Sequence, residues 1–135
     1  QGAHSNTYGG NLVASAAALA TIEILEEEKL PDRAEKLGAV MMGRLREMQA
    51  RFPPIGDVRG LGLMQVVEFV KDRRTKQPDE QLTDAVLRQG YKSGLILLPC
   101  GSGVRLIPPL VITEEQLCQG LDLLESAIAY ALKEQ

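Results

Sequence analysis

The chain has 135 residues and 44% hydrophobic content, which is typical of one folded domain and excludes a compositionally disordered chain. Its 15 basic and 18 acidic residues give a net charge of −3 without a basic stripe, so we expect no nucleic-acid partner. The longest apolar run, from Leu12 to Leu25, is interrupted by polar residues and is shorter than a membrane span of about 20 residues, so we expect no membrane partner either.

The cysteines and the single histidine give no metal-binding pattern. Cys100 and Cys118 lack the C-x-x-C spacing, and His4 has no second histidine to share a metal with, so we predict no metal site. We expect both cysteines to be free, buried thiols, which favours a cytoplasmic protein. The N-terminus has no signal-peptide pattern, and the chain begins at Gln1 without a methionine, which suggests a piece of a longer protein.

The first part of the chain predicts a loop followed by two helices. Residues 1–10 are polar and contain glycine, and Asn11 stands at an N-cap position before a helix from about Leu12 to Glu28. This helix is apolar on most sides, so we expect it to lie between two packed layers. Pro31 opens a second helix, whose apolar stripe recurs at steps of three and four residues: Ala34, Leu37, Met41, Leu45 and Met48.

The middle of the chain predicts a sheet interrupted by one helix. The glycine-rich, β-branched segment 57–70 fits either one strand bent near Gly60 and Gly62 or two strands. A third helix is predicted over 79–92, because Gly94 ends the helical pattern. Residues 95–98 and 104–107 predict two short strands that form a hairpin.

The end of the chain predicts a final helix and completes the fold. Thr113 and Gln116 have the spacing of a capping box, and an apolar stripe follows at Leu117, Leu121, Leu124, Ile128 and Ala131. The predicted fold is α/β, of the α+β two-layer kind: a small, mostly antiparallel sheet of about three or four strands covered by helices, preceded by a long interface helix. We expect a division into residues 1–30 and 31–135.

Two places in the sequence could bind an anion. In the segment 5–11, hydroxyl, amide and backbone N–H groups precede a helix N-terminus, which is an arrangement that can hold a phosphate. Arg105 lies on a short apolar strand, and an arginine mounted there could bind a carboxylate through its two-pronged guanidinium. On local evidence alone the simpler interpretations are a capped helix start and an edge-strand arginine exposed to water.

Two further polar residues are given no binding role. Arg59 invites the same carboxylate hypothesis as Arg105, but the neighbouring Gly60 and Gly62 indicate a bend, so a structural role is favoured. His4 is expected to be a polar loop residue.

Four segments in the same order resemble the class III, fold type I aminotransferases. They are residues 4–11 (HSNTYGGN) with the alanine-rich helix behind them, 58–63 (VRGLGL), 94–98 (GLILL) and 104–110 (VRLIPPL). The resemblance covers essentially the whole chain and implies the C-terminal portion of such an enzyme, with residues 1–30 as phosphate loop and interdomain helix and 31–135 as the small domain. One departure is Leu12, where the family usually has proline; in a first helical turn this costs little.

The resemblance also implies roles for individual residues. The threonine of the first segment reaches the pyridoxal phosphate (PLP) of a neighbouring subunit in this family, which gives Thr7 a cofactor-binding role, assisted by Asn6, and implies a homodimer. The arginine of the R-x-x-P-P-L segment receives the substrate carboxylate, which assigns substrate binding to Arg105. Both implications replace the simpler local interpretations.

No catalytic residue is expected in this chain. PLP chemistry needs a lysine that holds the cofactor covalently and an acidic partner for its ring nitrogen. The resemblance places both before Gln1, and none of the chain's lysines lies in that context: Lys29, Lys36, Lys71, Lys76, Lys92 and Lys133. We therefore expect the chain alone to be inactive and to bind no PLP covalently.

The resemblance implies an enzyme that moves an amino group from an amino acid to a keto acid such as 2-oxoglutarate. The segments 67–72 and 94–101 look most like those of 4-aminobutyrate aminotransferases. Ornithine or acetylornithine aminotransferases and amino-acid racemases of the same family stay open as alternatives. A hypothesis of another class, a non-enzymatic interaction module, also fits the apolar first helix.

Overall fold

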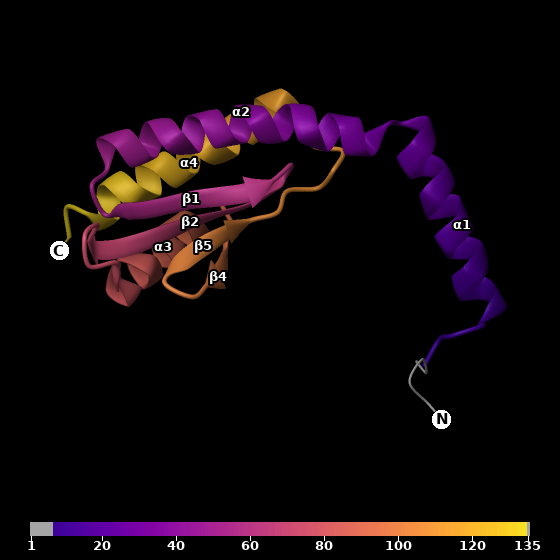
Figure 1. Ribbon diagram of the computed structural model, residues 1–135, viewed down its shortest axis with the longest axis horizontal. Coiled ribbons are helices and arrows are strands. Elements are labelled where there is room, and N and C mark those ends of the chain that lie inside the picture. Colours follow the sequence, from indigo (N-terminus) through magenta and orange to yellow (C-terminus); the bar gives the residue numbers. More distant parts are fainter. Residues whose placement is uncertain (1–6, 135) are drawn as a thin grey trace.

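The computed structural model describes residues 7–134, which contain four helices and a five-stranded sheet. The helices are α1 (Leu12–Glu27), α2 (Leu30–Arg51), α3 (Glu80–Lys92) and α4 (Glu114–Ala131). The strands are β1 (Ile55–Leu61), β2 (Met64–Asp72), β3 (Gln77–Pro78), β4 (Leu98–Cys100) and β5 (Gly103–Leu106). This arrangement confirms the predicted α/β fold class with a small antiparallel sheet covered by helices (Figure 1).

The sheet has the strand order β1-β2-β5-β4, with β3 added to β2, and every pairing is antiparallel. The segment that allowed one bent strand or two is two strands, joined by a tight turn between Leu61 and Met64. Gly60 has a φ of +152°, and a Cβ there would lie 2.2 Å from the carbonyl oxygen of Met64. A side chain at Gly60 would therefore force the two strands apart at their turn.

One face of the sheet carries the hydrophobic core. Helices α3 and α4 lie behind the sheet in the view of Figure 1, and α2 runs along it at the β1 side. The predicted stripes of the second and last helices are the ones that face this core. The core includes fully buried side chains from every layer: Met41, Leu45, Met48, Val67, Phe69, Leu82, Val86, Val104, Leu124 and Ile128.

Helix ends and strand limits follow local chemistry. Asp79 accepts a hydrogen bond from the Leu82 amide at 3.0 Å and caps α3, and the Thr113–Gln116 capping box starts α4. The strand predicted at 95–98 is wrong in its limits, because Leu95 and Leu97 pack against the core and pairing begins at Leu98. The predicted hairpin is confirmed, and its second strand, β5, begins at Gly103, one residue before the predicted start.

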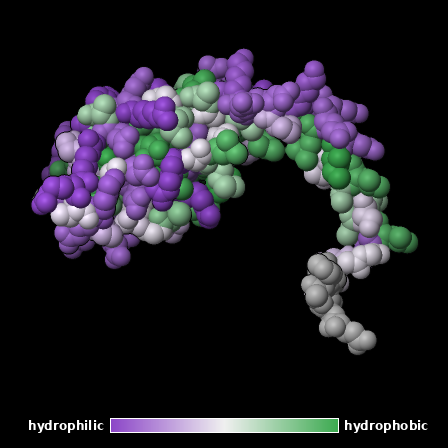
Figure 2. All heavy atoms as spheres, in the orientation of Figure 1, coloured by the Kyte–Doolittle hydropathy of each residue, from purple (hydrophilic) through white to green (hydrophobic). Residues whose placement is uncertain are grey.

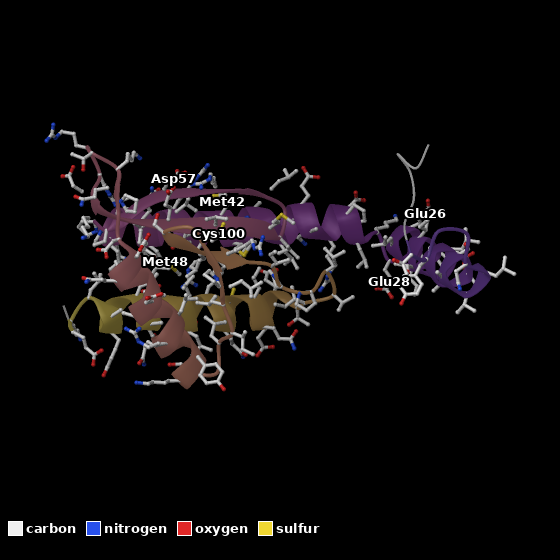
Figure 3. All side chains as sticks on the ribbon, turned by 90° about the horizontal axis from the view of Figure 1, so that it is seen from below. Glu26, Glu28, Met42, Met48, Asp57 and Cys100 are labelled. Carbon is white, nitrogen blue, oxygen red and sulfur yellow. The ribbon has the colours of Figure 1, made fainter. Side chains whose placement is uncertain are left out.

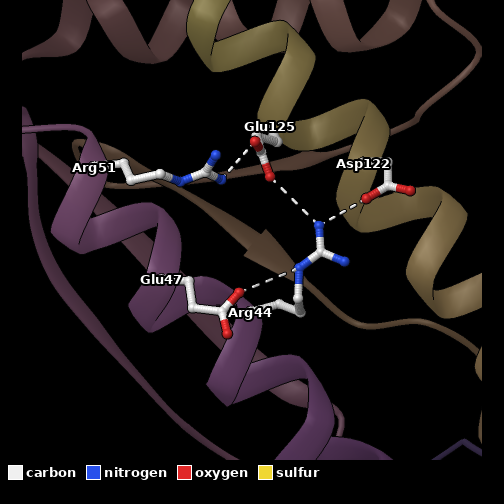
Figure 4. Close-up of polar contacts among 5 residues, drawn as sticks. All are labelled: Arg44, Glu47, Arg51, Asp122 and Glu125. Atoms are coloured by element: carbon white, nitrogen blue, oxygen red, sulfur yellow. Dashed lines mark hydrogen bonds and ion pairs between the residues drawn. The ribbon is translucent and has the colours of Figure 1, made fainter.

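Helices α2 and α4 are joined by an ion-pair network on the outside of the core (Figure 4). Arg44 Nη2 lies 2.7 Å from Asp122 Oδ1 and 3.4 Å from Glu125 Oε2, and Arg51 Nη2 lies 2.5 Å from Glu125 Oε1. Hydrogen bonding to Asp122, with its charge and that of Glu125, raises the pKa of Arg44 despite some loss of solvation. Exposed pairs of this kind add little stability, each about 0–1 kcal/mol, so the network orients the helices more than it holds them.

Helix α1 extends away from the sheet (Figure 1). None of its residues is buried, and large apolar side chains stand in the open: Leu12, Val13, Leu19, Ile22 and Ile24. Figure 2 shows hydrophobic surface along this helix. The helix itself is confirmed, whereas its expected place between two packed layers stays a prediction. Across residues 7–134, no helix combines the length and apolarity needed to cross a membrane.

The two cysteines are free, as predicted, but half-buried instead of buried. Cys100 ends β4 and Cys118 lies in the second turn of α4.

Candidate functional site

The sheet face away from α3 and α4 is open within the described part of the chain. Residues that pair directly across antiparallel strands point to the same face. Val67 pairs with Val104, and both are fully buried on the helix side, so their neighbours Val66 and Arg105 point to the open face. Figure 3 shows Asp57 on the side of the sheet away from α4, and Glu26 and Glu28 far from it at the end of α1.

Arg105 is an exposed cation on this open face. It pairs with Val66 of β2 on one side and with Leu98 of β4 on the other. The edge-strand interpretation is therefore wrong, because β5 lies between two strands that fix its backbone from both sides. Among residues 7–134, no carboxylate lies within ion-pair distance of the Arg105 guanidinium.

A largely apolar hollow adjoins the strand that carries Arg105. The hollow, of about 290 Å³, adjoins the end of β5, and Arg105 and Gln116 are the lining residues with polar side chains. The other lining residues are apolar and include the core side chains Met41, Leu117 and Leu121, so most of the hollow lies on the helix side of the sheet, whereas the Arg105 side chain points to the open face. A guanidinium without a carboxylate partner among residues 7–134 is suited to bind a small molecule that carries a carboxylate.

A second cation lies in the same row of the sheet. Arg59 pairs with Val66 from the β1 side, so Arg59, Val66 and Arg105 stand side by side on three strands. Unlike Arg105, Arg59 donates from Nη1 to Asp57 Oδ2 and to Glu68 Oε2, both at 2.7 Å. These contacts agree with the structural role favoured for Arg59. The two carboxylates were missed, although Asp57 and Arg59 at i and i+2 of one strand had to share a face.

The N-terminal turn forms the other candidate site. Asn11 Oδ1 accepts from the Ala14 amide at 3.0 Å, and the Asn11 amide donates to the Tyr8 carbonyl at 3.1 Å. Gly10 takes a left-handed φ of +76° in this turn. The exposed Thr7 therefore precedes a capped helix, and Asn6 and His4 lie outside the described residues.

The two candidate sites do not meet within the chain. Thr7 precedes the N-terminal end of α1 and Arg105 lies on β5. Helix α1 extends away from the sheet (Figure 1). Because α1 separates them, the described residues do not close one pocket around both.

Comparison with known proteins identifies the family. The family model described as Aminotransferase class-III matches residues 1–128 of this chain. The chain belongs to the class-III aminotransferases. Among class-III relatives, the leucine/methionine racemase of Thermococcus litoralis is 50% identical over 127 residues, which are 93% of this chain and 29% of the racemase. The 4-aminobutyrate aminotransferase of Mycobacterium leprae is 46% identical over 121 residues, which are 87% of this chain and 27% of that enzyme. The chain thus spans less than a third of these relatives' length.

Solved transaminase structures have the same fold. An aminotransferase from Vibrio fluvialis, crystallised in its PMP-bound form, superimposes with a TM-score of 0.89 at 32% identity, over 98% of this chain and 30% of that one. An amine transaminase from an uncultivated Pseudomonas species, crystallised with PLP, gives 0.88 at 35% identity, over 96% of this chain and 30% of its own. The family uses PLP.

The residues of the N-terminal turn fit the phosphate of such a cofactor. The first amides of a helix have no hydrogen-bond partner within the helix. The Asn11 side chain accepts a hydrogen bond from only one of them, the Ala14 amide. The first turn of α1 contains no acidic residue that would repel an anion. The free amides at the start of α1 are therefore donors that suit a phosphate.

Proposed function

We propose that this chain is the C-terminal part of a PLP-dependent aminotransferase that moves an amino group from an ω-amino acid, with 4-aminobutyrate favoured, to a keto acid such as 2-oxoglutarate. The observation that carries the proposal is Arg105, a guanidinium on the open face of a central strand that has no carboxylate partner among residues 7–134. Each proposed substrate has a carboxylate that this group could receive.

In the proposed enzyme the chain supplies binding groups. Thr7, with Asn6, would hold the cofactor phosphate, and the separation of Thr7 from Arg105 along α1 favours a homodimer in which Thr7 serves the neighbouring subunit. PLP, when bound, supplies the electron sink that stabilises negative charge on the substrate carbon. Arg105 would orient the substrate by its carboxylate, which leaves the amino group free to reach the cofactor. The proposed division at residue 30 separates these two tasks.

The lysine that holds PLP is proposed to lie in the part of the protein that this chain does not include. The relatives are more than three times as long as the segment they share with this chain, which leaves room for it. The chain alone would then be inactive. Family membership favours this over a non-enzymatic interaction module.

The test is Arg105→Gln in the whole protein, with Arg74→Gln as the matched control. Arg74 is an exposed arginine in the segment between β2 and β3. Loss of a charge-assisted hydrogen bond should raise KM for 4-aminobutyrate and 2-oxoglutarate about 10- to 100-fold. Cofactor absorbance should not change, and Arg74→Gln should behave as wild type. Unchanged KM values for Arg105→Gln would remove Arg105 from the substrate site.

A racemase is the second candidate, because the leucine/methionine racemase has 50% identity to this chain, against 46% for the 4-aminobutyrate enzyme. The two are separated by their products. A racemase converts pure L-leucine to a mixture of enantiomers without a keto acid, whereas the proposed aminotransferase forms glutamate only when 2-oxoglutarate is present.

A further inference from the structure

Arg59 binds two carboxylates on the open face. Its Nη1 donates to Asp57 and to Glu68 at 2.7 Å each, and all three side chains are about half exposed or less, at 55%, 44% and 36%. The hydrogen bond to Glu68, followed by that to Asp57, raises the pKa of Arg59. Both acids are thus held on the β1 side of the sheet.

The strand register places two arginines within reach of the Glu68 side chain. Glu68 pairs with Asp57 on β1 and with Gly103 on β5, while Val66 pairs with Arg59 and with Arg105. Both arginines therefore lie one diagonal step from Glu68, and long side chains reach across such a diagonal of about 7–8 Å. Gly103 has no side chain that would block Glu68 from turning toward β5.

We propose that Arg59 is a positioning residue that holds Glu68 on the β1 side and so keeps it away from Arg105. Without Arg59, Glu68 would be free to turn toward Arg105 and compete with the substrate carboxylate. The inference rests on the proposed role of Arg105 in substrate binding. It explains why, of the two guanidiniums in one row, only one is neutralised within the described residues.

The experiment compares single and double variants of the whole protein. Arg59→Gln frees Glu68, so KM for 4-aminobutyrate and 2-oxoglutarate should rise about 2- to 5-fold, which is the effect of one exposed ion pair. The kcat should stay unchanged, and so should KM for an amine without a carboxylate. The double variant Arg59→Gln/Glu68→Gln should return KM to the wild-type value, and Arg59→Lys, which keeps the cation, should stay close to it.

Three outcomes separate this inference from the proposed function. If Arg105→Gln raises KM but Arg59→Gln does not, the positioning role is wrong and the role of Arg105 stands. If neither changes KM, the proposed substrate site is wrong. If Arg59→Gln raises KM and Glu68→Gln does not reverse the effect, Arg59 acts by another route and the inference is overturned. Arg59→Met, which keeps the aliphatic stem against the sheet, serves the same comparison should Arg59→Gln fold poorly.

Discussion

Two glycines of α2 allow a controlled test of how closely this helix packs on the sheet. A Cβ at Gly38 would lie 2.4 Å from the carbonyl carbon and oxygen of Gly62, in the turn between β1 and β2. A Cβ at Gly43, on the exposed side of the same helix, would meet nothing within 4 Å. Gln65 ties the contact together, because its Nε2 donates to the carbonyl oxygens of Gly38 and Gly62 at 2.8 Å each.

We predict that Gly38→Ala is destabilising and Gly43→Ala is stabilising. Replacing a helical glycine by alanine contributes about 1 kcal/mol at either position, so this gain cancels when the two variants are compared. What differs is the overpacking at Gly38, which costs about 1–3 kcal/mol because backbone has to move and the Gln65 hydrogen bonds stretch. The free energy of unfolding of Gly38→Ala should be lower than that of Gly43→Ala by this amount.

Urea unfolding followed by circular dichroism measures the difference. With a slope of about 2 kcal/mol per molar urea, the two midpoints should differ by about 0.5–1.5 M. Equal midpoints, or a higher one for Gly38→Ala, would refute the reasoning, because α2 would then be able to shift from the turn without cost.

Two further predictions concern single side chains. Thr113→Ala removes the cap of α4 and should lower the free energy of unfolding by about 1 kcal/mol in the same urea assay, whereas Thr21→Ala, which removes no cap, should change it by less than about 0.5 kcal/mol. Hydrogen bonds from the backbone N–H of Thr75, at 2.7 Å, and then from its hydroxyl lower the pKa of Asp72 below 3.8. Its stabilising effect is therefore present at higher pH and lost as pH falls through the lowered value; an NMR titration midpoint at or above 3.8 would contradict this.

The sequence predicted those parts of the fold whose cause is local. Helices α2, α3 and α4 follow from apolar periodicity and capping chemistry, and the Thr113–Gln116 box forms as expected. The strand order could not be predicted, because the placement of β5 between β2 and β4 depends on pairing between distant segments. The short strand β3 was missed for the same reason, since Gln77 and Pro78 have no strand pattern of their own.

The candidate site was predictable only in part. The resemblance of the segment around Arg105 predicts that this residue binds a carboxylate, which stays a prediction, and the structure adds that its strand is central and its guanidinium unpaired within residues 7–134. The diagonal relation of Glu68 to Arg59 and Arg105 required the register of three strands, which the sequence does not contain. The Arg44–Asp122 contact joins residues 78 positions apart and could not be predicted from the sequence either.

The stability of helix α1 affects the position of the turn that precedes it. A 16-residue helix with no buried residue gains nothing from the core of this chain, and helices of that length are marginal in water without tertiary contacts. Within residues 7–134 nothing covers Leu19, Ile22 and their exposed neighbours, so further stabilisation of α1 would have to come from a surface outside this part of the chain. In the proposed enzyme the position of Thr7 would therefore depend on the surface that covers α1, and an agent that loosens this cover should weaken phosphate binding without contacting the phosphate.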